Sequence, residues 1–199
     1  MSKTIRMLGI DPALRNTGLA VGNYNIDTGN LDVFRVELAK TDKGGDGKVV
    51  RKSSDDLRRA RIIVAAIQSA VKLHRPHIAV AEVPGGCQSA RGAFSNGICC
   101  GVLASLGVPL VEVSPDEVKL ASVGNKTAPK SAIIQWATQA WPNAGWSMGK
   151  YRGQIKLLDE NEHMADACAA IAAGLLTAQF AQAVAMMTAM AGIPATEAG

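Results

Sequence analysis

Residues 5–24 read IRMLGIDPALRNTGLAVGNY, and this stretch decides the fold. An apolar run ends at Asp11, a turn follows at Pro12, and a second apolar run begins near Gly18. The pattern predicts two antiparallel strands, roughly Ile5–Asp11 and Gly18–Tyr24. A carboxylate at the end of a buried strand is costly unless it binds something, although Asp11 could also be a turn former before proline.

The rest of the chain predicts a mixed α/β sheet. A hairpin signal at 27–30 leads to a third strand, and later apolar runs alternate with helical spacing. Residues 40–52 are expected to form a mobile loop, and the Gly-rich residues 142–158 an irregular segment. We expect five strands, the first three antiparallel and the one ending at Glu82 beside the first. The further strands are predicted at Leu31–Leu38, His77–Val83 and Pro109–Val113, and the helices at Ser53–Leu73, Ser89–Leu106, from a capping box at Ser114–Glu117, at Lys130–Trp141 and from about Asn161.

Two further acids stand in settings like that of Asp11. Glu82 ends the apolar run 78–81, and Asp166 lies at the start of the last apolar helix. Carboxylates from separate elements are ligands that Mg²⁺ prefers, and two such ions support phosphodiester cleavage. His163 precedes Asp166 by three residues and shares its helix face, where it could bind metal or exchange protons. These residues predict a metal-dependent nuclease with catalytic and metal-binding residues Asp11, Glu82, His163 and Asp166.

Other interpretations of the acidic residues stay open. Glu82 could pair with a buried arginine instead of a metal. The acids Asp159, Glu160 and Glu162 could simply favour the N-terminal end of the helix dipole, and Glu162 could replace His163 as the fourth ligand.

Composition is that of a single globular domain. The 199 residues, 48% hydrophobic and 19% charged, are enough for a full core. We therefore expect one domain over 1–199, with residues from about 181 to 199 as a C-terminal tail. The four cysteines lack CxxC spacing, which favours buried thiols in a reducing compartment. No signal peptide is apparent, and the alanine-rich stretch 165–193 predicts a packing helix rather than a membrane span.

Charge is distributed unevenly along the chain. Residues 118–158 contain no acid but carry six basic residues, and all three tryptophans lie there. Basic side chains neutralise phosphates and aromatic ones stack on bases, so this pattern indicates a nucleic-acid-binding face. A solvated face with tryptophans in the core is the alternative, and Trp136 fits it better. We predict DNA contacts at Lys119, Lys126, Lys130, Lys150, Arg152 and Lys156, with Arg91 as a further candidate.

The order of these motifs resembles that of the RuvC family of Holliday-junction resolvases, in the ribonuclease H-like superfamily. Residues 9–12 with Thr17 and Gly18 resemble the first motif, and Ala81-Glu82 resembles the second acid at a strand end. Residues 114–130 are similar to the segment that leads to the family's basic helix. Residues 163–169 resemble its closing motif, in which an acid or histidine precedes the final aspartate by three. The likeness runs, with gaps, over about residues 7–173, and a divergent viral or phage member would fit.

The resemblance implies a ribonuclease H-like fold, a mixed five-stranded sheet flanked by helices. The activity it implies is that of a crossover junction endodeoxyribonuclease, a hydrolase that resolves four-way junctions during DNA recombination and repair. It further implies two Mg²⁺ ions per active site, with Mn²⁺ able to substitute. A homodimer acting on branched DNA in the cytoplasm (the host cytoplasm if viral) is expected, with neither a membrane nor a small-molecule cofactor.

One departure from the family keeps other substrates open. The family commonly has an aromatic residue shortly after the second acid, whereas none occurs here between Glu82 and Phe94. A related nuclease acting on other branched DNA or on RNA-containing substrates is therefore an alternative. An actin-like or sugar-kinase ATPase would need a second nucleotide-binding domain, and a non-catalytic junction-binding protein would not need all three acids.

Overall fold

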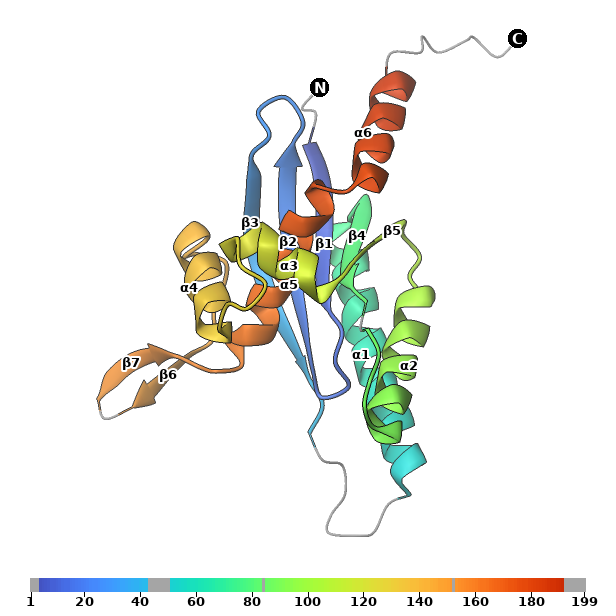
Figure 1. Cartoon of the computed structure of the whole chain (residues 1–199), viewed down its shortest axis with the longest axis vertical. Helices are drawn as coiled ribbons and strands as arrows, with labels where there is room; N and C mark the ends of the chain where they lie inside the picture. The colour runs from blue at the N-terminus through green and yellow to red at the C-terminus, as the bar shows by residue number, and fades with distance from the viewer. Residues whose placement is uncertain (1–3, 43–50, 84, 152, 192–199) are drawn as a thin grey trace.

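A five-stranded mixed sheet forms the centre of the molecule (Figure 1). The computed structural model describes residues 4–42, 51–83, 85–151 and 153–191. The strand order is β3-β2-β1-β4-β5, with β1, β2 and β3 antiparallel and β1, β4 and β5 parallel. The predicted sheet is confirmed, including the placement of β4 beside β1. The strands are β1 Thr4–Asp11, β2 Asn16–Asn25, β3 Leu31–Lys40, β4 Ile78–Glu82 and β5 Leu110–Val113.

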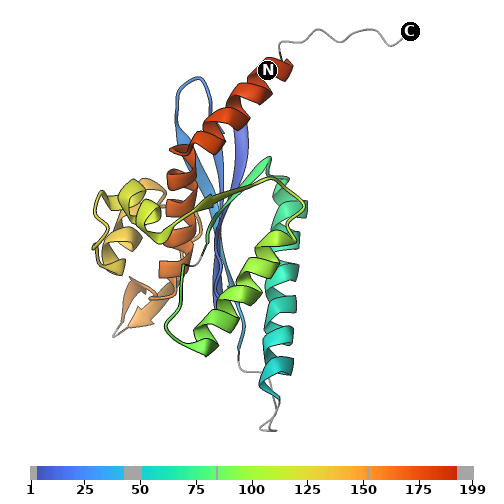
Figure 2. The same cartoon turned by 45° about the vertical axis from the view of Figure 1, so that its right-hand side comes forward.

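Helices cover both faces of this sheet (Figure 2). On one face lie α1 and α2, whose side chains Ile63, Ile67 and Val102 join a core with Leu8 and Ile10. On the other face lies α5, with α3 and α4 packed against it. The helices are α1 Lys52–His74, α2 Ala90–Ala104, α3 Pro115–Val123, α4 Lys130–Ala140, α5 Asn161–Leu175 and α6 Ala178–Ala191.

The central helix α5 is buried at most of its fifteen positions, which explains its composition. Ten of its positions are buried, and most carry alanine or another small side chain. Small side chains let a helix lie close to a sheet, so α5 packs directly over β1, β2 and β4. No single helix in the described ranges is long and apolar enough to cross a membrane, although α5 and most of α6, bent by 67°, meet that criterion together by length and composition.

Local signals in the sequence set the start of several helices. The capping box at α3 is confirmed, because the Ser114 hydroxyl accepts from the Glu117 amide at 3.3 Å and the Glu117 carboxylate accepts from the Ser114 amide at 2.7 Å. At α2 the Ser89 hydroxyl accepts a hydrogen bond from the Gly92 amide at 3.0 Å. These contacts satisfy amides that a helix leaves without partners.

The structure differs from the sequence-based expectations in three places. The segment 142–158, predicted to be irregular, contains an antiparallel hairpin of β6 Met148–Tyr151 and β7 Gln154–Leu157. The packing helix predicted over 165–193 is divided into two helices, α5 and α6, and α6 runs through the start of the predicted tail as far as Ala191. All four cysteines are free thiols, but two of them, Cys87 and Cys100, are exposed rather than buried. Most of the predicted loop 40–52 lies outside the described residues.

Candidate active site

Asp11 and Glu82 end neighbouring parallel strands. Asp11 is the last residue of β1 and Glu82 the last of β4. The two strands pair in register up to Ile10 and Ala81, so the next residue on each strand is an acid. The fold therefore places both carboxylates at one edge of the sheet, as the sequence predicted.

Two glycines allow α5 to approach this edge. A Cβ added at Gly18, which pairs with Asp11 across β1 and β2, would lie 1.9 Å from the His163 carbonyl oxygen. A Cβ added at Gly9 would lie 2.1 Å from the Ala167 carbonyl oxygen. No side chain other than hydrogen fits at either position, so the helix backbone rests on the strands there. This contact brings the first turns of α5 next to Asp11.

The helix contributes a histidine that bonds directly to Asp11. His163 Nδ1 lies 2.7 Å from Asp11 Oδ2, and both side chains are largely buried. The hydrogen bond to Asp11 raises the pKa of His163 above its ordinary value, because the carboxylate favours the protonated ring. This hydrogen bond therefore holds the His163 ring against the Asp11 carboxylate.

Glu82 and Asp166 experience an excess of negative charge. Burial, and then the charges of Asp11 and Asp166, raise the pKa of Glu82 to about 7. Burial, followed by the charges of Asp11 and Glu162, likewise raises the pKa of Asp166 to about 7. A divalent cation would stabilise the ionised forms of these carboxylates, so the donor set fits Mg²⁺.

The side chains of the candidate site lie near one another but do not form a complete metal-binding site. Within the part of the chain that the structure describes, no three His, Cys, Asp or Glu side chains already converge on one ion position. One oxygen of Asp11 bonds to His163 instead. Binding of a cation would therefore require the three carboxylates to turn towards one another.

The acids at the start of α5 have other partners. Glu162 forms an ion pair with Lys130, and Glu160 pairs with Lys40 at 2.7 Å. Asp159 is exposed. Because Glu162 is held by a lysine whereas His163 bonds to Asp11, the geometry favours His163 over Glu162 as the fourth group of the site.

Most of the predicted DNA-contacting residues lie in two parts of the chain, the region of α3 and α4 and the β6–β7 hairpin. Lys119 on α3 and Lys130 at the start of α4 lie within electrostatic reach of the acids. The charge of Lys119 opposes the rise in the pKa of Glu82. The hydrogen bond to Glu162 raises the pKa of Lys130, and the charges of Asp166 and Asp11 contribute to this rise. Lys126 pairs with Asp116 at 2.9 Å on the exposed surface. The hairpin carries the remaining basic positions, of which Arg152 lies outside the described residues. Contact with DNA stays a prediction for all of them.

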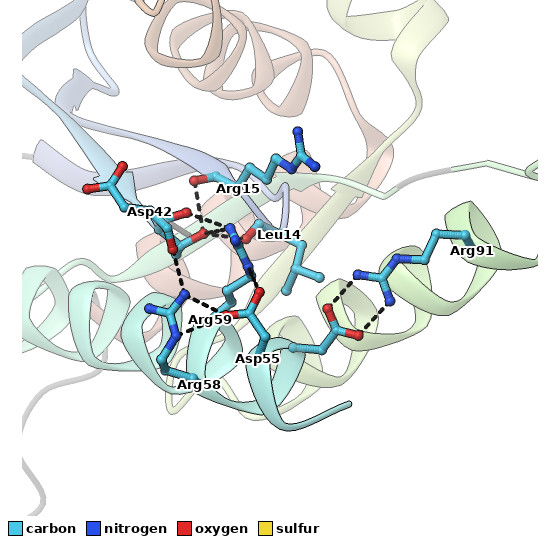
Figure 3. A network of polar contacts seen from close by, with 9 residues as sticks. Leu14, Arg15, Asp42, Asp55, Arg58, Arg59 and Arg91 are labelled. Atoms are coloured by element: carbon cyan, nitrogen blue, oxygen red, sulfur yellow. Dashed lines mark hydrogen bonds and ion pairs between the residues drawn. The ribbon is translucent and has the colours of Figure 1, made fainter. Parts of the chain in front are cut away.

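Arg91 belongs to a polar network that the sequence did not reveal (Figure 3). Its guanidinium donates two hydrogen bonds, each 2.5 Å, to the buried carboxylate of Asp56 on α1. Arg91 thus fastens the start of α2 to α1, and any DNA contact it makes would compete with this ion pair.

The same network holds the turn that follows Asp11. Buried Arg59 donates to the Thr41 hydroxyl at 2.8 Å and to Asp55 at 2.8 Å. The Thr41 hydroxyl in turn donates to the Leu14 carbonyl at 2.7 Å, and the Thr41 amide donates to the Arg15 carbonyl at 2.8 Å. Helix α1 therefore supports both the β1–β2 turn, which follows Asp11, and the beginning of α2.

Comparisons of the sequence and of the structure with known proteins point to the same group of proteins. No protein-family profile matches the sequence. The chain is similar to the crossover junction endodeoxyribonuclease RuvC of Burkholderia multivorans, with 34% identity over 68% of this chain and 71% of the relative. The RuvC of Hyphomonas neptunium is 29% identical over 73% of this chain and 83% of the relative. Among solved structures, Thermus thermophilus RuvC in complex with a Holliday junction substrate matches with a TM-score of 0.59 at 20% identity, over 85% of this chain and 92% of that one. This likeness supports the ribonuclease H-like fold.

Proposed function

The chain belongs to the RuvC family of crossover junction endodeoxyribonucleases, and from this premise we propose that Asp11, Glu82 and Asp166 form a metal-binding site that cleaves four-way DNA junctions. One observation carries the proposal: Asp11 and Glu82 end neighbouring strands, Asp166 on α5 lies close enough for the charges of the three acids to interact, and the pKa values of Glu82 and Asp166 are raised to about 7. Acids whose ionised forms are disfavoured by burial and mutual repulsion are typical of functional sites.

Each group has a role that its surroundings support. Mg²⁺ held by the three carboxylates would activate a water molecule and stabilise the leaving oxygen of the phosphodiester. His163 bonds to Asp11 through Nδ1, which fixes the ring and leaves Nε2 to exchange a proton with the attacking water. Lys119 and Lys130 place positive charge beside the acids and would help to hold the scissile phosphate.

The substrate we propose is a branched DNA with two opposed strands to cut. The Thermus thermophilus relative forms a complex with a Holliday junction. A single site of the kind described above cuts one strand, so symmetric resolution of a junction requires two copies of the chain, and we propose a homodimer. Two Mg²⁺ ions per site, replaceable by Mn²⁺, would suit the donor set. Because its substrate would be DNA in a bacterial cell, or in a host cell infected by a virus, we propose that the protein acts in the cytoplasm.

A second substrate class is favoured by one feature of the sequence. No aromatic residue occurs between Glu82 and Phe94, and Phe94 itself lies on α2 beside the guanidinium of Arg91, 5.8 Å from ring centroid to Cζ. Selectivity for the four-way junction would then have to come from another element. The same chemistry acting on flaps, other replication intermediates or RNA-containing duplexes is the alternative.

Cleavage of a defined substrate panel tests the proposal. The panel holds a four-way junction, a three-way junction, a flap, an RNA–DNA hybrid and a linear duplex, all of the same arm sequence. Reactions contain Mg²⁺, Mn²⁺, Ca²⁺ or a chelator. We expect paired nicks in opposed strands of the four-way junction with Mg²⁺ or Mn²⁺. Equal cleavage of the linear duplex, or full cleavage in the presence of chelator, would contradict the proposal.

A further inference from the structure

The hairpin of β6 and β7 follows α4 and precedes α5 in the chain. It extends away from the body of the molecule (Figure 1). Met148 pairs with Leu157 across the two strands, and Lys150 pairs with Ile155. Directly opposed residues point to the same face of a sheet, so these four side chains share one face. The exposed fractions are 58% for Met148, 67% for Ile155 and 40% for Leu157. The hairpin therefore presents an apolar face with one lysine to solvent.

The base of the hairpin is fixed to the candidate active site. Asn161 is fully buried and is the first residue of α5, two positions before His163. Its side-chain oxygen accepts from the Ser147 amide, and its side-chain nitrogen donates to the carbonyls of Ser147 and Leu158, each at 2.8 Å. The helix that supplies His163 thus also holds both ends of the hairpin.

The apolar face continues into a groove beside the hairpin. Its lining includes Pro142, Gly145, Trp146, Met148 and Leu157. The Trp146 ring is held in place because its indole nitrogen donates to the Trp141 carbonyl at 2.8 Å. A fixed aromatic ring at the end of an aliphatic face suits a flat, apolar ligand.

Charge identifies the kind of partner. The hairpin sequence 148–158 has three basic residues and no acid, and the acid-free region extends back to residue 118. A second copy of this chain seated on the same face would bring its Lys150 towards the first Lys150, with no acid among the four residues of the face. Nucleic acid supplies the complementary charge, and aliphatic side chains that project between lysines are used to insert between parted bases.

We propose that the face formed by Met148, Lys150, Ile155 and Leu157 binds unpaired bases of branched DNA next to the scissile strand. The aliphatic side chains and Trp146 replace stacking that bases lose where the strands part, and Lys150 contacts a flanking phosphate. This inference rests on the proposed function, because it assigns recognition of the branch point to the hairpin.

A fluorescence titration tests the proposal in the full-length protein. The probe is a four-way junction with 2-aminopurine at the branch point, titrated without metal at several salt concentrations. Wild type should raise the fluorescence, because the probe base leaves its stack. Ile155→Ser should abolish most of this rise and weaken binding about tenfold, or ~1.4 kcal/mol, without changing the salt dependence. Lys150→Ala should lower the slope of log affinity against log salt by roughly 0.9 and leave most of the fluorescence rise.

Leu73→Ser is the matched control. Leu73 is an aliphatic residue, 70% exposed, in the last turn of α1, where the chain turns to enter β4 at the end opposite Glu82. Its substitution should change neither fluorescence nor affinity. Each substituted residue is exposed, and a melting curve of each variant verifies the fold.

The outcomes separate this inference from the proposed function. If wild type cleaves the four-way junction but Ile155→Ser behaves as Leu73→Ser does, the hairpin does not contact the bases and the inference is overturned. A change in the sedimentation of the free protein with Ile155→Ser, with DNA binding unaltered, would instead make the face a protein contact and also overturn it. Failure of wild type to cleave any branched substrate would reject the proposed function itself.

Discussion

Replacing Gly18 by alanine should slow cleavage strongly while leaving most of the structure and DNA affinity intact. Gly18 pairs with Asp11 across the β1–β2 ladder. The new Cβ would lie 1.9 Å from the carbonyl oxygen and 2.3 Å from the carbonyl carbon of His163, and 2.9 Å from the amide nitrogen of Met164, so all three atoms belong to the helix backbone. A backbone cannot rotate away as a side chain would, and the first turn of α5 must move.

The size of the movement follows from the contact. The separation must grow from 1.9 Å to at least 3.0 Å, a displacement of 1.1 Å. Misplacing a reacting group by about 1 Å costs roughly 100-fold in rate. Overpacking of this kind lowers the free energy of unfolding by about 1–3 kcal/mol, which a domain of this size tolerates. The cleavage rate should therefore fall strongly while the protein stays folded.

Single-turnover cleavage of a saturating four-way junction measures the rate, and thermal melting measures the stability. Gly22→Ala is the control, because it lies on the same strand but its Cβ would come no nearer than 3.1 Å to the Asp32 carbonyl oxygen. We expect about a 100-fold slower rate for Gly18→Ala and a near-normal rate for Gly22→Ala. If Gly18→Ala cleaves within threefold of wild type, the helix does not set the geometry of the site and the reasoning is wrong.

Three other predictions follow from the site and its surroundings. Asp11→Asn should abolish Mg²⁺-dependent cleavage and leave junction affinity largely unchanged in a metal-free titration, since phosphate contacts supply most of the affinity; a normal rate would remove Asp11 from the chemistry. Asp56→Asn should lower the melting temperature by about 2–4 °C at neutral pH, the shift that loss of ~1 kcal/mol gives at this chain length. Arg91 holds the pKa of Asp56 below its ordinary value, so the ion pair stabilises the fold fully above the unfolded pKa of about 3.9. The difference in melting temperature between wild type and Asp56→Asn should therefore vanish as the pH falls through the folded pKa of Asp56. A difference that stays constant with pH would contradict the ion pair. Replacing Lys119, Lys126 and Lys130 together by alanine should make the salt slope in binding titrations smaller by roughly 0.9 for each phosphate that is no longer neutralised. An unchanged slope would mean that these three side chains do not contact DNA.

The sequence predicted the sheet and the edge at which Asp11 and Glu82 lie because their signals are local. Apolar runs that end in an acid, the hairpin at 27–30 and the capping box at 114–117 each lie within a few residues. The strand that ends at Glu82 could be placed beside β1 because both acids needed to share one site, and the observed register agrees.

The parts that the sequence did not reveal depend on contacts between distant residues. Arg91 and Asp56 are 35 positions apart and Lys130 and Glu162 are 32 apart, so neither pair leaves a pattern in the chain. The β6–β7 hairpin has strands of only four residues each, with glycines near its turn, too short for alternation to be recognised. Its support by Asn161 is likewise visible only in the folded chain.

Helix α5 explains why the two glycines and the closing motif belong together. Gly9 and Gly18 lie on different strands, more than 140 positions before His163, yet both are in contact with the α5 backbone. A larger residue at either position would move the helix, and with it His163, Asp166 and the base of the hairpin held by Asn161. The position of one helix on two glycines thus sets the distance between the acids and also the place of the element that we propose to contact the branch point. A change in how α5 sits should therefore alter cleavage and branch-point recognition together, whereas a change on the hairpin face should alter recognition first.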